Sequence, residues 1–416
     1  MAGALKIRFA VVGLVACLLL CGARFYARAD PAAGPLTRAQ AYERATAMAA
    51  LGRKLFNDPS LSASGQMACA TCHSPEHAFG PAGAEPVHYG GKDMKQPGLR
   101  AVLSLRYLQA VPQFTEHYFE PEDDGDESID NGPTGGLTWD GRVDRGREQA
   151  RVPLLSPYEM ANENGSDVVG KVRKAVYADE LLKIFGMTIF DDGNKAFDAI
   201  TQALEVYEQS ERDFYPYSSK YDAYLAGRAR LSEPEARGLA LFKDENKGNC
   251  STCHRSEPDN DGTPPQFTDF GMIAIGVPRN NAIPANADPK YFDLGLCGPL
   301  RTDLRDKPEY CGLFRTPSLR NVALRKIFYH NGQTHSLKEA VAFYVERDTN
   351  PGKWYSRNPD GSVRKYDDLP AAYHGNINVE PPFGQQAGEK PRLSDAEIDD
   401  IVAFLQTLTD GYASGR

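Results

Sequence analysis

Two short segments of the chain carry two cysteines and a histidine at the same spacing: ACATCH, which ends at His73, and NCSTCH, which ends at His254. Thiols two residues apart can bind zinc, perform dithiol redox chemistry, or add across the two vinyl groups of a haem. The adjoining histidine is then placed to bind the haem iron. Both copies keep this histidine, and no βαβ pattern surrounds either, so covalent haem is favoured over zinc and over thiol chemistry. The predicted attachment residues are Cys69, Cys72, Cys250 and Cys253.

The N-terminus has the layout of a secretory signal. Lys6 and Arg8 precede an apolar run from about residue 9 to residue 23, and small residues follow up to Ala29. The run is short for a membrane-spanning helix. We predict cleavage near Ala29, export to the periplasm, and no integral membrane domain in the mature protein. An uncleaved anchor and a lipoprotein modified at Cys21 are less favoured alternatives.

Charge and length narrow the class of protein further. Loss of residues 1–29 removes four of the 47 basic residues and no acidic ones, which leaves 43 against 56, a net charge of −13. Such a chain lacks the basic surface of a nucleic-acid-binding protein. Its length predicts about two to three domains. Cys297 and Cys311 lie outside both motifs and are predicted to form a disulfide after export.

The surroundings of the two motifs also match. LGRKLFND, which contains Gly52, precedes the first motif, and RGLALFKD, which contains Gly238, precedes the second, 181 residues later. A repeat of this length indicates two related domains. We predict a mostly α fold with long loops around the cofactors. A signal peptide at 1–29 precedes an N-terminal c-type haem domain at 30–225 and a C-terminal one at 226–416, whose final helix packs back, with the last segment reaching the N-terminal domain.

Helix starts are readable from the residues that cap them. The predicted N-caps are Thr37, Ser232, Ser336 and Ser394. The last two are predicted to form capping boxes with a glutamate three residues later. An apolar stripe after Ser394 predicts a C-terminal helix that stops at Gly411. Strand signals are sparse.

Several separated motifs, in the same order, resemble the bacterial di-haem cytochrome c peroxidase family, and within it the MauG-like enzymes. The matching segments are LGRKLFNDPSLSASGQMACATCH, WDGR, FRTPSLRNVALRKIFYHNG and EIDDIVAFLQTL. The resemblance covers nearly all of the chain after the signal. It implies an N-terminal haem that reacts with hydrogen peroxide and a C-terminal haem that transfers electrons, with His73 and His254 as ligands of the two irons.

The resemblance also implies roles for four residues. Trp139, in WDGR, would lie between the two haems on the electron path. Gln149, Pro153 and Glu159 would lie above the N-terminal haem. Cleavage of peroxide requires a group that takes a proton from the inner oxygen and returns it to the outer one, which a carboxylate can do. Gln149 would orient peroxide, and Pro153 would keep the iron accessible.

The second haem needs a sixth ligand. Peroxidases of the family carry a methionine fourteen residues after the histidine that corresponds to His330, whereas this chain has Tyr344 there, as MauG-like enzymes do. Tyr344 shares a predicted helical face with Leu337 and Val341. Met272 is the rival ligand. A thioether favours reduced iron, whereas an anionic phenolate favours more oxidised iron.

Two features depart from the family. Ala101, in RAVLSL, replaces an asparagine that would help to bind a Ca²⁺ ion between the haems, so calcium is an open expectation. The acid-rich segment 120–137 is predicted to be a solvated loop, and its spacing fits an EF-hand poorly. His77 and His88 lie near the first motif, but neither matches the removable histidine of the family, so a five-coordinate N-terminal haem is predicted.

The main hypothesis is an exported di-haem c-type oxidoreductase that uses hydrogen peroxide to oxidise a partner protein. The second is a cytochrome c peroxidase that receives electrons from a small redox protein, either a cytochrome or a cupredoxin. The third is a non-catalytic electron carrier.

Overall fold

The computed structural model of the chain describes residues 36–120 and 126–413, so the predicted signal peptide lies outside the described residues. The segment Arg44–Arg416 forms one compact unit. Within the described ranges, no helix is long and apolar enough to cross a membrane.

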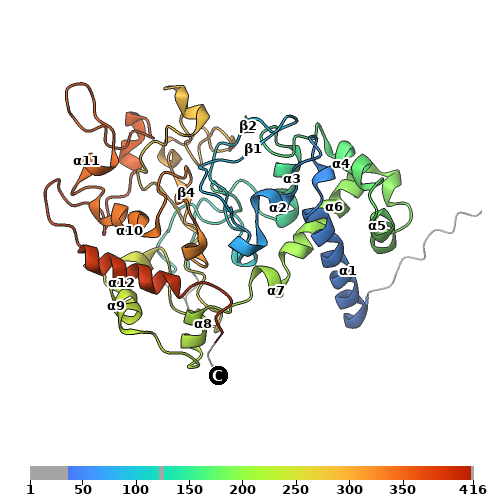
Figure 1. Cartoon of the computed structure of the whole chain (residues 1–416), viewed down its shortest axis with the longest axis horizontal. Helices are drawn as coiled ribbons and strands as arrows, with labels where there is room; N and C mark the ends of the chain where they lie inside the picture. The colour runs from blue at the N-terminus through green and yellow to red at the C-terminus, as the bar shows by residue number, and fades with distance from the viewer. Residues whose placement is uncertain (1–35, 121–125, 414–416) are drawn as a thin grey trace, which may run out of the picture. The chain divides into compact units, whose positions relative to one another are not determined.

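Helices joined by long loops make up the fold (Figure 1). The helices before residue 226 are α1 (Arg38–Phe56), α2 (Cys69–Cys72), α3 (Gly146–Leu155), α4 (Gly165–Val172), α5 (Ala178–Phe185), α6 (Gly193–Glu208), α7 (Glu211–Phe214) and α8 (Lys220–Leu225). Those after it are α9 (Glu233–Lys243), α10 (Leu337–Glu346), α11 (Pro351–Trp354) and α12 (Asp395–Gln406). Two antiparallel pairs of very short strands accompany them, β1 (Tyr89–Gly90) with β2 (Gln96–Pro97) and β3 (Met272–Ile273) with β4 (Phe314–Arg315).

The four predicted N-caps are confirmed. Helices α1, α9, α10 and α12 each begin directly after the expected residue. At α12 the capping box is complete, because Ser394 N–H donates to Glu397 and the Glu397 N–H donates to Ser394 Oγ. At α10 the Glu339 N–H donates to Ser336 Oγ as predicted, but the return bond to the Glu339 carboxylate differs from the capping box. The Glu339 carboxylate accepts from His335 N–H, at 3.4 Å, rather than from Ser336.

The end of α12 corrects the sequence prediction. The helix stops at Gln406, five residues before Gly411. The Thr407 hydroxyl donates to Phe404 O at 2.6 Å, which satisfies one of the last helical carbonyls. After this point bonds to the third residue back replace the helical ones, as Leu408 N–H donates to Leu405 O and Thr409 N–H donates to Gln406 O.

Asp410 ties the C-terminal end to the first half of the chain. Its carboxylate accepts hydrogen bonds from Arg106 Nη1 and from the Tyr107 hydroxyl, both at 2.8 Å. It also accepts one from Asn321 Nδ2, at 2.7 Å. The segment after α12 therefore packs back on a loop more than 300 residues earlier.

Two glycines at equivalent places in the repeat allow two pairs of helices to cross closely. A Cβ atom at Gly52 in α1 would lie 2.0 Å from the Ala203 carbonyl oxygen of α6. A Cβ atom at Gly238 in α9 would lie 1.9 Å from the Asp400 carbonyl oxygen of α12. Figure 1 shows α9 and α12 side by side. The shared Gly in the sequence repeat therefore reflects a shared packing constraint.

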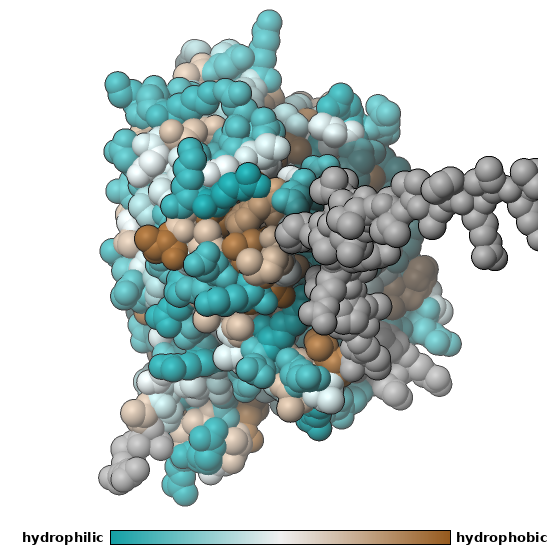
Figure 2. Space-filling view, turned by 90° about the vertical axis from the view of Figure 1, so that its right-hand side faces the viewer, coloured by the Kyte–Doolittle hydropathy of each residue, from teal (hydrophilic) through white to brown (hydrophobic). Residues whose placement is uncertain are grey.

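Hydrophobic side chains gather in separate clusters, two of which divide the chain between Phe214 and Tyr221 of α8. One cluster draws its residues from positions 51–214, and another draws them from positions 221–408. The face in Figure 2 is largely hydrophilic, with small hydrophobic patches. The predicted boundary between two haem domains at residue 225 stays a prediction, because one compact unit spans both sides of it.

Replacement of Gly238 by alanine should destabilise the protein by about 1–3 kcal/mol, because the added methyl group overlaps backbone of α12. Gly170 in α4 is a matched control, since nothing lies within 4 Å of a Cβ built there. Gly170→Ala should stabilise the helix by about 0.5–1 kcal/mol. Urea denaturation of both variants measures the difference. Equal stabilities would contradict the close crossing.

Candidate functional site

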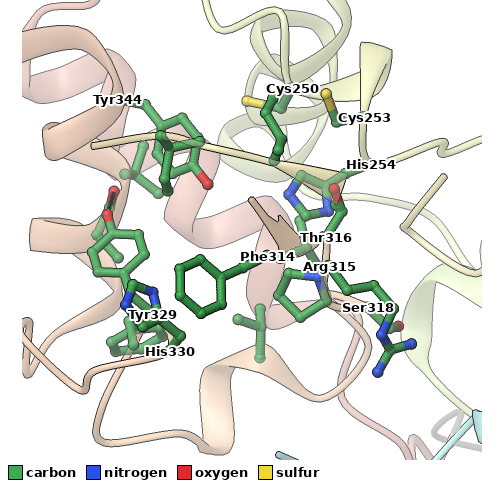
Figure 3. Close-up of a pocket in the computed structure, with 18 of the residues that line it drawn as sticks. Cys250, Cys253, His254, Phe314, Arg315, Thr316, Ser318, Tyr329, His330 and Tyr344 are labelled. Atoms are coloured by element: carbon green, nitrogen blue, oxygen red, sulfur yellow. Dashed lines mark hydrogen bonds between the residues drawn. The ribbon is translucent and has the colours of Figure 1, made fainter. Parts of the chain in front are cut away.

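The second Cys-x-x-Cys-His segment opens onto a cavity of about 450 Å³. Cys250 begins a short 3₁₀ turn after α9, and Cys253 and His254 follow it. All three line the cavity, as does Tyr344 of α10. Figure 3 shows the Tyr344 hydroxyl pointing into the space that His254 faces.

A backbone carbonyl orients each motif histidine. His254 Nδ1 lies 2.8 Å from Phe267 O, and His73 Nδ1 lies 3.0 Å from Phe79 O. Since a carbonyl can only accept, each Nδ1 carries the hydrogen and each Nε2 keeps its lone pair. Metal-binding histidines are typically held in this way. Burial lowers the pKa of both imidazoles to about 4, so both are neutral at pH 7.

The four motif thiols are unpaired and protonated. Burial raises the pKa of Cys72, Cys250 and Cys253 to about 12, and that of Cys69 further. Both zinc binding and dithiol exchange use thiolates. In the described part of the chain, no three His, Cys, Asp or Glu side chains gather as a metal site. Each pair of thiols adjoins a histidine whose Nε2 keeps its lone pair, which is the arrangement that attachment of a haem requires.

Tyr344, and not the rival Met272, faces the second cavity. The Tyr344 ring stacks on Phe383 with centroids 5.3 Å apart, and burial raises the pKa of its phenol. Met272 lies in β3 and its methyl group packs at Gly141. Among the described residues that line the cavity, Ile273 is present and Met272 is not. Cys250, Cys253 and His254 would hold a haem in this cavity, which Tyr344 also lines.

The first motif lies in α2, and Glu159 is close to it. Burial is the main cause that raises the pKa of Cys69. The charges of Glu208, Cys72 and Glu159 raise it further. Burial and then the charge of Glu159 also raise the pKa of Cys72. The chain turns back after α3, where Met160 N–H donates to Pro153 O at 3.0 Å. This turn brings Glu159 toward the thiols.

Gln149 and Pro153 are four residues apart on α3, so they lie on one face of the helix. Burial raises the pKa of Glu159 above its ordinary value, while a hydrogen bond from Ser156 and the charge of Arg142 lower it. A carboxyl whose pKa is shifted toward neutrality suits both acceptance and return of a proton. The structure thus brings Glu159 near the first motif. Glu159 lies on the turn that follows α3, the helix that carries Gln149 and Pro153.

Trp139 lies beside the second cavity and is 7% exposed. Its indole N–H donates to Ala101 O at 2.8 Å. Its ring meets the His330 ring edge-on, with centroids 6.4 Å apart, and His330 stacks on Phe314 at 3.7 Å. The carbonyl of Ala101, the residue at the position predicted to affect calcium binding, therefore accepts a hydrogen bond from Trp139.

Sequence reasoning missed the buried charges around Trp139. Arg100 Nη1 lies 2.7 Å from Asp140, and Arg100 Nε lies 2.6 Å from Asp293. These side chains are only 7%, 0% and 8% exposed. Arg301 donates to the Asp140 carbonyl at 2.9 Å. Only WDGR, which contains both Asp140 and its near partner Arg142, could have signalled this cluster, because Arg100 lies 40 residues from Asp140 and 193 from Asp293.

Cys297 and Cys311 form a disulfide with Cα atoms 5.0 Å apart. The bond lies in the loops that precede β4. The Gly295 N–H donates to Asp293 Oδ1 at 3.1 Å, so the disulfide loop begins at the buried charge cluster.

Two paired-thiol motifs, each with a histidine presenting Nε2, define a protein built to hold two haems. The family described as di-haem cytochrome c peroxidase matches residues 46–230. The methylamine utilization protein MauG of Paracoccus denitrificans is 35% identical over 395 residues, which cover 91% of this chain and 92% of that protein. The chain belongs to the di-haem cytochrome c peroxidase family, in its MauG-like branch. It is a di-haem, peroxidase-type oxidoreductase.

Solved structures agree with this assignment. The diheme peroxidase BthA from Burkholderia thailandensis has a TM-score of 0.77 at 40% identity, with 87% of this chain and 86% of that chain covered. A MauG-like protein associated with microbial copper homeostasis has a TM-score of 0.61 at 25% identity, with 90% and 91% covered.

Replacement of Arg100 by leucine should destabilise the protein by about 3–5 kcal/mol, because two buried carboxylates lose their partner. Burial opposes ionisation of Asp140, but Arg100 and Arg142 lower its pKa to about 2. The stabilisation is therefore present above the unfolded pKa of about 4 and is lost as pH falls toward 2.

Denaturation at several pH values measures this dependence. The exposed pair of Lys92 and Glu163 supplies the control, and Lys92→Leu should change the stability far less than Arg100→Leu. A penalty for Arg100→Leu that does not shrink at low pH would contradict the assigned role of Asp140.

Proposed function

We propose that this chain oxidises a partner protein with hydrogen peroxide, with the peroxide cleaved at the N-terminal haem site. The observation that carries the proposal is that Tyr344 and His254 face one cavity with Trp139 beside it. Tyr344 as the sixth ligand distinguishes this function from that of a methionine-ligated electron-transfer site.

The motif residues would hold the two haems. Cys69 and Cys72 would form thioethers to the first haem, and Cys250 and Cys253 to the second. When bound, the haems supply iron that binds peroxide and exchanges electrons. His73 and His254 are neutral, fixed donors at Nε2 and would bind the two irons.

Glu159 would move the proton that peroxide cleavage requires. Its carboxylate would take a proton from one peroxide oxygen and return it to the other, which would leave as water when the O–O bond breaks. Gln149 orients peroxide by a hydrogen bond. Pro153 has no side-chain ligand, so this face of the site stays open.

Trp139 would carry electrons between the two sites. It is buried beside the second cavity, and its hydrogen bond to Ala101 fixes the indole. The Tyr344 phenolate would favour a more oxidised second iron, so oxidising equivalents persist until the partner protein supplies electrons.

A cytochrome c peroxidase that takes electrons from a small cytochrome or cupredoxin is the second candidate. The similarity to the diheme peroxidase BthA favours it. Glu159 and Trp139 would keep the same roles, and only the electron source differs.

Export to the periplasm with cleavage near Ala29 completes the proposal. The disulfide between Cys297 and Cys311 supports an oxidising compartment. Two haem domains, at 30–225 and 226–416, agree with the separate hydrophobic clusters. A Ca²⁺ ion between the haems stays a prediction, and the Ala101 carbonyl already accepts from Trp139.

Glu159→Gln should slow the reaction of the diferric enzyme with hydrogen peroxide by about 10²–10⁴-fold, because the amide cannot accept and return the proton. Stopped-flow absorbance of the haem measures the rate. Glu163→Gln, four residues along and exposed, is the control. Both variants should keep two haems on a denaturing gel. Unchanged kinetics for Glu159→Gln would remove this residue from the mechanism.

Tyr344→Met should raise the reduction potential of the second haem, on the order of 0.1–0.3 V, because a thioether favours reduced iron. Redox titration measures the shift. Tyr329→Phe is the control, since that buried ring lies 6.4 Å from Tyr344 and its hydroxyl bonds to Ala340 O. An equal potential in the wild type and Tyr344→Met would exclude Tyr344 as the ligand.

A further inference from the structure

A separate polar cavity, of about 370 Å³, lies beside Gln149 of the predicted peroxide site and has no role in the proposed function. Its lining is mainly polar and charged, unlike the apolar surroundings that suit a haem. The lining includes Asp144, Arg145, Arg147, Gln149, Glu205 and Glu208. Gln149 thus connects this cavity to the residues assigned to peroxide.

Glu208 differs from the other carboxylates of this cavity. It is the last residue of α6, and its carboxylate makes no ion pair or hydrogen bond with the residues that the structure describes. Glu205, one turn earlier, pairs with Arg147 at 3.2 Å. Arg147 therefore faces a carboxylate already, and Glu208 remains without a counter-charge in a half-buried place.

Glu208 also faces the first haem motif. Apart from burial, its charge has the largest effect on the pKa of the Cys69 thiol. Burial and the neighbouring charge of Glu205 raise the pKa of Glu208 to about 8. At pH 7 the carboxyl is therefore mostly protonated and holds a proton that water in a polar cavity can accept.

The reaction itself requires such a source of protons. Reduction of one hydrogen peroxide to two waters breaks the O–O bond and forms two O–H bonds. It takes up two electrons, which the partner protein or redox donor supplies, and two protons. Glu159 only returns the proton that it took, so the two additional protons must come from solvent.

We propose that the polar cavity delivers protons to the peroxide site and that Glu208 holds the proton to be delivered. Glu208 gives its proton to water beside Gln149 and regains one from solvent, so its role is to position protons rather than to touch peroxide. This route rests on the proposed function, because it presupposes that peroxide reacts near Glu159.

The first test is the pH dependence of steady-state hydrogen peroxide reduction by the holoenzyme with an artificial electron donor in excess, because the two additional protons enter together with the two electrons. The wild-type rate should fall as the pH rises through about 8, because Glu208 loses its proton there. Glu208→Gln should be about 10²-fold slower at pH 7 and should lose this inflection. Glu208→Asp should restore part of the rate. Glu148→Gln, exposed on α3, should match the wild type.

The second test is infrared titration of the resting holoenzyme without peroxide. The wild type and Glu148→Gln should contain a protonated carboxyl that titrates near pH 8, and Glu208→Gln should lack it. The carboxyl of Asp368, whose pKa burial raises to about 7, should remain in all variants.

A wild-type enzyme that does not react with peroxide would overturn the proposed function. A reactive wild type matched by Glu208→Gln at every pH would overturn the proton route alone. A carboxyl signal near pH 8 that persists in Glu208→Gln would also overturn it.

Discussion

The buried guanidinium of Arg100 fixes the loops that place Trp139 beside the cavity of the second motif. It lies between the carboxylates of Asp140 and Asp293, which come from segments far apart in the chain. A buried charge that loses its partners is strongly destabilising, so these loops have one favourable arrangement. Because Asp140 directly follows Trp139, the same ion pairs fix the indole beside the second cavity. Loop structure of this kind would otherwise be mobile.

The two halves of the chain solve the same packing problem with the same devices. In each, a helix with a glycine crosses a second helix closely before the haem motif. In each, a later backbone carbonyl accepts from the histidine Nδ1, six residues on in the first half and thirteen residues on in the second. The halves differ in what accompanies the histidine. Glu159 lies near the first motif and Tyr344 faces the second cavity, so one haem motif supports two different chemistries.

Electrons and protons have separate routes in the proposed function. The electron route is aromatic, through Trp139 beside the second cavity. The proton route is polar, through the cavity that contains Gln149 and Glu208. This separation has a physical reason, because protons move along hydrogen-bonded water, whereas an indole transfers electrons without hydration. A buried carboxyl without a counter-charge costs folding free energy, which a function in proton transfer explains.

The sequence by itself determined the features that local spacing encodes: the two haem motifs, the four helix starts, the glycine repeat, and Tyr344 as the aromatic on the inner face of its helix. Tertiary structure alone decided the features that depend on distant partners. Arg100 meets Asp293 across 193 residues, and Glu208 faces Cys69 from the end of another helix. Tertiary structure also placed the segment after the last helix, because Asp410 bonds to a loop of the first half. Spacing determines which side of a helix a residue occupies, but only folding determines what that side meets.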